Sequence, residues 1–149
     1  MQIKLGLSLL WRVIALQLAF TIIFFVLLKN TELMSNPEFM QLKPSVLTAG
    51  YGLFLLMTTF ILKNGLVYVV LGHRLNKNRI FWKKFTLALS VLYLLISILN
   101  FAVANAASVE FWLQYKTFGP LVLLLFFCVT APRYIERFNS SLHTAPSGQ

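Results

Sequence analysis

The sequence is poor in the side chains that carry out catalysis and bind metals. It has four acidic residues, all of them glutamate, together with two histidines and a single cysteine. General acid–base catalysis and metal coordination both need several such groups close together, and one cysteine cannot form a disulfide within the chain. No glycine-rich phosphate-binding loop is present either. We therefore expect no enzymatic activity, no metal ion and no cofactor.

What the chain has in excess is apolar side chains. Hydrophobic residues make up 58% and charged residues 11% of it, whereas an average soluble domain has about 45–50% and about 25%. Four apolar stretches are each long enough to cross a bilayer as a helix, and they are continuous rather than alternating, which argues against membrane strands. The sequence thus predicts a single all-α membrane domain, residues 1–149, with four transmembrane helices. These spans are expected at residues 5–28, 46–71, 85–107 and 118–134.

Local breaks affect the ends of the second and fourth spans. Residues 63–65, Lys-Asn-Gly, interrupt the second span, so residues 66–71 either lie along the membrane interface or continue a longer, kinked helix. Pro120 is expected in the first turn of the fourth span, where proline loses nothing by lacking an amide hydrogen. Pro132 is expected at the end of that span, and residues 138–149 are expected to form a polar tail.

Basic side chains gather in one loop. Residues 73–84 contain no acid, whereas the other loops balance lysine with glutamate. The positive-inside rule therefore places this loop, and with it both termini, in the cytoplasm. The net charge of +9 is explained by this topology and by contact with anionic lipid rather than by nucleic-acid binding. The residues expected to reach lipid headgroups are Arg12, Arg74, Lys77, Arg79, Lys83 and Lys84.

A short phrase occurs twice in the chain. Residues 38–45 are EFMQLKPS and residues 110–120 are EFWLQYKTFGP, each with Glu-Phe followed by a glutamine and a lysine. Each phrase precedes a span that returns to the cytoplasm, which predicts two tandem helical hairpins, residues 1–72 and 73–149, related by a twofold along the membrane normal. Chance recurrence is the alternative, because aromatic and lysine side chains are common at membrane interfaces. Under either interpretation, we expect the aromatic ring and the lysine amine of each phrase to anchor the helix that follows it at the membrane interface.

Asn100 is the most informative polar residue within a span. A carboxamide in hydrocarbon is costly unless it is paired, so Asn100 should face another helix or a polar cavity. Hydrogen bonding between helices is the first interpretation, and a role in transport is the second.

The residues from position 36 to 119 resemble the intracellular septation protein A family. The most specific part is WLQYKTFG, residues 112–119, where family members show Trp-Val-Asn-Phe-Lys-x-Phe-Gly, and EFMQLKPS is similar to the family's Glu-Phe-Ile-Lys-Trp-Lys-Pro-Thr. The usual N-terminal stretch of the family has no counterpart before Leu5, so the resemblance implies a shortened or diverged member. The positions that match the family are Phe39, Lys43, Trp82, Asn100, Trp112, Lys116, Phe118 and Gly119.

This resemblance implies a multi-pass protein of the bacterial inner membrane. It would support cell-envelope synthesis and septation through contacts with lipids and other membrane proteins, such as the division or elongation machinery, and a homo-oligomer is left open. The alternative is a small transporter or lipid-handling subunit with a polar site between the two hairpins. A buried Asn100 would favour the first function, and an open cleft lined by Asn100, Lys43 and Lys116 would favour the second.

Overall fold

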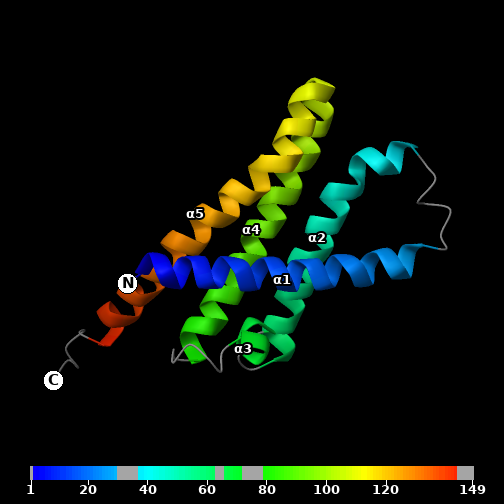
Figure 1. Ribbon diagram of the computed structural model, residues 1–149. Coiled ribbons are helices and arrows are strands. Elements are labelled where there is room, and N and C mark those ends of the chain that lie inside the picture. The colour runs from blue at the N-terminus through cyan, green and yellow to red at the C-terminus, as the bar shows by residue number, and fades with distance from the viewer. Residues whose placement is uncertain (1, 30–36, 63–65, 72–78, 144–149) are drawn as a thin grey trace.

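The computed structural model describes residues 2–29, 37–62, 66–71 and 79–143, and all regular structure in these segments is helical (Figure 1). The predicted all-α fold is therefore confirmed. The elements are α1 (Gln2–Leu28), α2 (Pro37–Ile61), α3 (Leu66–Leu71), α4 (Arg79–Ala106) and α5 (Val109–His143).

Four of these helices are long and apolar enough to cross a membrane, as the sequence predicted. The second span is shorter than expected, because α2 ends at Ile61 and residues 66–71 form the separate helix α3. Val67 of α3 is buried, and the Tyr68 ring lies 6.5 Å from the Trp82 ring at the start of α4. The candidate spans are Gly6–Leu28, Leu42–Ile61, Arg79–Ala106 and Val109–Arg137.

The expected positions of the two prolines in the last span were wrong. Pro120 and Pro132 both lie inside α5, which begins at Val109 and continues to His143, into the segment expected to be a polar tail. For Pro120 the reason is that the repeated phrase before it is itself helical. Glu110 is the second residue of α5, where a carboxylate is favoured by the helix dipole.

The most extensive contact joins α2 to α4, which belong to different predicted hairpins. A Cβ added to Gly52 would lie 3.1 Å from the Ser90 carbonyl oxygen and 3.2 Å from the Leu94 side chain, so glycine favours this close approach of the two helices. Beside this crossing, the Tyr51 and Tyr93 rings meet edge to face with their centroids 4.7 Å apart. The core is thus centred on the α2–α4 pair.

Helix α1 lies across the other helices instead of running along α2 (Figure 1). Near its start, a Cβ added to Gly6 would lie 3.1 Å from the carbonyl oxygen of Cys128 in α5. That carbonyl lacks its usual helical donor because position 132 is proline. Further along, α1 bonds to α4 through Gln17 and reaches α2 through Phe20, whose ring lies 5.2 Å from the Tyr51 ring.

Candidate functional site

A hydroxyl group joins α2 to α4 toward the end of the molecule where α4 stops at Ala106 and α5 starts at Val109. We call this end the turn end. The Ser97 hydroxyl donates a 2.8 Å hydrogen bond to the Ser45 carbonyl oxygen, which links the two helices directly. The Thr48 hydroxyl is also buried here, but its bonds go to carbonyls of its own helix. Ser97 therefore provides the directional contact in this part of the interface.

Asn100 lies one helical turn beyond Ser97 and is almost completely buried, with 3% of its surface exposed. Its Oδ1 atom has no hydrogen-bond partner within the described part of the chain. A side chain enclosed to this extent cannot line an open cleft. By the criterion set from the sequence, this burial favours a packing role for Asn100 over a place in a transport pathway.

The two lysines of the repeated phrase both lie toward the turn end, because α2 and α5 both begin there. The Lys43 amine lies 4.3 Å from the centroid of the Phe25 ring in α1. The Lys116 amine lies 4.9 Å from the centroid of the Trp112 ring, one turn earlier in α5. Both geometries are cation–π contacts, but the first joins two helices and the second stays within one. The Phe39 side chain lies outside the described residues.

The WLQYKTFG segment packs mainly against itself. A Cβ added to Gly119 would lie 2.6 Å from the Cε2 atom of Tyr115, so glycine at this position makes room for the tyrosine ring. Phe118 and Leu113 point outward, with 65% and 50% of their surfaces exposed. The stretch that resembles the family most closely is therefore largely a surface of α5.

Trp82 lies at the opposite end of α4, away from the other residues of the family motif. It is completely buried and makes ring contacts with Tyr68, Phe81 and Phe85. The structure thus brings Lys43, Asn100 and the start of α5 to one end, but it does not place Trp82 with them. Trp82 instead belongs to the core that holds α3 against α4.

The predicted headgroup-contacting residues are placed in different surroundings. Arg79 and Lys83 are exposed at the start of α4, and Lys84 is half-buried. Arg12 is half-buried as well, and its Nη1 atom is enclosed without a hydrogen-bond partner in the described segments. Arg74 and Lys77 lie outside the described residues.

Sequence reasoning missed a polar contact at the centre of the molecule. The Tyr93 hydroxyl donates a 2.7 Å hydrogen bond to the Gln17 Oε1 atom and joins α4 to α1. A groove of about 230 Å³ lies beside this bond, between α1, α4 and α5. Gln17 could have been found by the same signal as Asn100, since it too is a carboxamide inside an apolar run. The groove is lined by Ile14, Gln17, Leu18, Thr21, Tyr93, Thr117, Pro120, Leu121 and Leu124.

The chemistry that this arrangement offers is packing and hydrogen bonding. Within the described segments, no group of three or more His, Cys, Asp or Glu side chains could hold a metal ion. Cys128 of α5 is completely buried within the hydrophobic core. Most hydroxyls, such as those of Thr59 and Thr86, donate to a carbonyl one turn earlier in their own helix.

Four apolar helices that pack through close backbone crossings, aromatic rings and buried hydroxyls define a multi-pass α-helical membrane protein. The family model described as intracellular septation protein A matches residues 2–141, so the chain belongs to that family. This confirms the resemblance inferred from the motifs, and with the four spans it identifies a multi-pass protein of the inner membrane.

Curated relatives carry the name inner membrane-spanning protein YciB. The protein from Coxiella burnetii (strain Dugway 5J108-111) is 28% identical over 125 residues, which cover 83% of this chain and 69% of the relative. The protein from Escherichia coli O1:K1 / APEC is 30% identical over 102 residues, which cover 68% of this chain and 57% of the relative. No solved structure matches the chain.

Proposed function

We propose that this protein supports septation and cell-envelope synthesis without catalysis, through contacts between its helices and other inner-membrane proteins. The observation that carries the proposal is the exposure of the start of α5. In the segment that resembles the family most closely, Leu113 and Phe118 are 50% and 65% exposed, and the preceding Phe111 is 54% exposed, so these side chains are available to a partner. Partners that fit such a surface are apolar transmembrane helices with a polar group near Lys116.

The test uses a bacterium whose own family member has been deleted and in which septation or envelope synthesis is impaired. Phe118→Ala is compared with Phe60→Ala, a matched control because Phe60 is 79% exposed near the other end of α2. At matched membrane levels, we expect the control to restore division and to co-purify division or elongation proteins in mild detergent. Phe118→Ala should lose both. The proposal fails if the two variants behave alike.

We also propose that the start of α4 and both chain termini face the cytoplasm. For α4 and α5 the fold supports this proposal, since the start of α4 and the end of α5 both lie opposite to the turn between Ala106 and Val109. For the N-terminus the support is the charge distribution of the loops. In a Cys128→Ser background, a cysteine at Arg79 should react with an impermeant thiol reagent only in permeabilised cells. A cysteine at Val109 should react from the periplasmic side. The reverse pattern would invert the topology.

A small transporter or lipid-handling subunit is a second candidate, favoured by the groove beside Gln17 and Tyr93. The groove places polar atoms between the first helix and the last two helices. If substrate passes here, Tyr93→Phe and Gln17→Leu should abolish complementation while the protein stays folded. If the protein acts through its surface, both variants should complement division despite a small loss of stability.

A further inference from the structure

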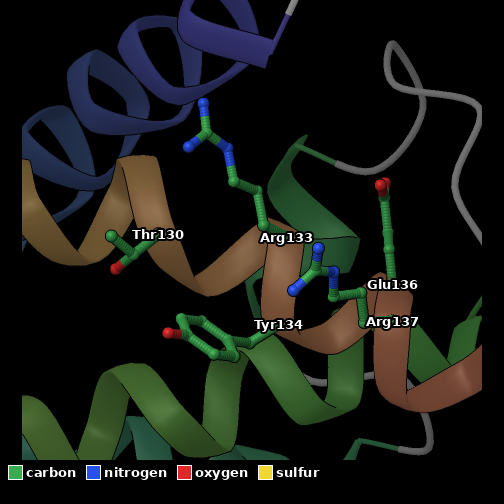
Figure 2. Close-up of a pocket in the computed structure, with 5 residues that line it drawn as sticks. All are labelled: Thr130, Arg133, Tyr134, Glu136 and Arg137. Atoms are coloured by element: carbon green, nitrogen blue, oxygen red, sulfur yellow. The ribbon is translucent and has the colours of Figure 1, made fainter.

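A second hollow lies at the far end of α5, where basic side chains gather. It has a volume of about 420 Å³ and lies at the same end of the molecule as the start of α4, because the Phe127 ring of α5 meets the Phe85 ring of α4 at 5.6 Å. Figure 2 shows the side chains that line it, which are Thr130, Arg133, Tyr134, Glu136 and Arg137.

The lining combines two guanidinium groups with one carboxylate. Arg133 and Arg137 are one helical turn apart, so they project from the same side of α5. In Figure 2, the Arg133 side chain extends toward α1, while the Glu136 carboxylate points away from Thr130 and Tyr134. Positive charge therefore exceeds negative charge here, and arginine is the side chain best suited to bind a phosphate through paired hydrogen bonds.

The same face of α5 becomes apolar toward the middle of the span. Phe126 lies one turn before Thr130 and is 69% exposed, and Val122 lies one turn before Phe126 and is 58% exposed. In the other direction, Tyr134 is 72% exposed beside the arginines. This order, with an apolar strip that leads to hydroxyls and guanidinium groups, matches the order of acyl chain, glycerol and phosphate in a phospholipid.

We propose that this hollow binds the phosphate headgroup of an anionic phospholipid, with an acyl chain along Phe126 and Val122. The excess of cations favours a headgroup of net negative charge over a zwitterionic one. The apolar strip favours a lipid over free phosphate, because free phosphate has no apolar part that could contact the strip. The site lies at the other end of α5 from the surface proposed to contact partner proteins and does not depend on that function.

The experiment measures lipid retention by the intact protein, with native mass spectrometry after incorporation into nanodiscs. Phosphatidylglycerol and phosphatidylethanolamine with identical acyl chains are supplied in equal amounts. The variant is Arg133→Gln/Arg137→Gln, and the matched control is Arg79→Gln/Lys83→Gln, which removes the same charge from the same end. We expect the wild type and the control to retain phosphatidylglycerol preferentially. The pocket variant should lose about tenfold in retention, as expected for the loss of charge-assisted hydrogen bonds.

Several outcomes would overturn the site. An equal loss in the control would mean that only general surface charge attracts the lipid. Equal retention of phosphatidylethanolamine would remove the anionic selectivity, and displacement by inorganic phosphate at millimolar concentration would indicate a site for free phosphate. Glu136→Gln provides a second test if the arginine variant does not fold. It removes the carboxylate from the lining and should raise phosphatidylglycerol retention, so unchanged or lower retention would contradict the proposal.

Discussion

The α2–α4 pair and the two outer helices are built differently. Of the best apolar window in each span, 39% is buried for α2 and for α4, whereas only 11% is buried for α1 and 22% for α5. The central pair is held by the Gly52 crossing, the Tyr51–Tyr93 ring contact and the bond from Ser97. Helix α1 is held by fewer contacts, near Gly6, Gln17 and Phe20.

This difference separates residues that hold the fold from residues available to lipids and partners. Apolar side chains gain little by leaving lipid for another helix, so close packing and hydrogen bonds decide which membrane helices associate. These contacts are concentrated between α2 and α4. The outer faces of α1 and α5 are therefore the places where a substitution should change interactions with the surroundings more than it changes stability.

The largest effect is expected where the central pair is tightest. Gly52→Val should destabilise the protein by about 1–3 kcal/mol, because the added methyl groups would push α2 away from the Ser90 carbonyl and Leu94. Gly50→Val is the control on the same helix, since a Cβ there would meet only the Phe20 ring, at 3.9 Å. Reversible unfolding in mixed micelles measures both variants. Equal destabilisation by the two substitutions would show that the close approach of α2 and α4 at Gly52 is not the source of the effect.

The next effect should be confined to α1. Gly6→Leu would collide with the Cys128 carbonyl and with Val129, where a Cβ already lies 3.1 Å and 3.2 Å away, and should lift the start of α1 from α5. Cys128 is the only cysteine; its side chain is completely buried, and its backbone carbonyl lies at this crossing. We therefore expect a membrane-permeant maleimide to label Gly6→Leu several times faster than the wild type, with the α2–α4 pair still folded.

The outcome of this labelling would also sharpen the comparison between the two regions. Gly50→Val serves again as the control and should leave Cys128 protected. If Gly6→Leu unfolds the whole protein together with the exposure of Cys128, then α1 is part of one cooperative unit with the central pair. The separation between core and outer helices would then be wrong.

A smaller effect is expected from the bond between Ser97 and Ser45. Ser97→Ala should cost about 0.6 kcal/mol, the average for hydrogen bonds between membrane helices. Ser90→Ala is the control, because the Ser90 hydroxyl is also buried in α4 but donates to Leu87 of its own helix. Unfolding of the two variants should differ by this amount. A larger loss in Ser90→Ala would mean that hydroxyl volume matters more than the bond between helices.

The number of spans and their helical structure were predictable from the sequence, but the helix pairing was not. Four continuous apolar runs indicate four membrane helices by length alone. A helix in lipid is apolar on every side, so its periodicity does not reveal which face is buried. The close approach at Gly52 and the crossing at Gly6 depend on how each helix is rotated about its axis. The apolar runs do not specify that rotation.

Part of the candidate site could be predicted from the sequence. Asn100 stood out because a carboxamide in an apolar run is expected to face another helix or a polar cavity rather than lipid, and it is 3% exposed. Arg133 and Arg137 were not singled out as a site, because charges at the end of a span have an ordinary explanation in lipid headgroups. The start of α5 was placed too late because Gln114, Lys116 and Thr117 lower the apolar character of a segment that is nevertheless helical.

The smallest effect concerns the two lysines of the repeated phrase, and it tests whether stability and function separate between the helices. Lys43→Met removes the cation–π contact between α2 and Phe25 of α1, and should cost about 0.5–1 kcal/mol. Lys116→Met removes the contact with Trp112 inside α5, which joins no second helix. We expect its effect on unfolding to be smaller.

The same pair of variants should show the opposite order in complementation at matched membrane levels. Lys116 lies in the exposed segment that resembles the family most closely, so Lys116→Met should impair division more than Lys43→Met does. Methionine keeps a long unbranched side chain, which limits the change to the loss of the charge. If Lys43→Met were inactive while Lys116→Met were fully active, the outward face of α5 would not be the functional surface. The roles assigned to the helices would then be exchanged, with α2 carrying the functional surface and α5 serving the fold.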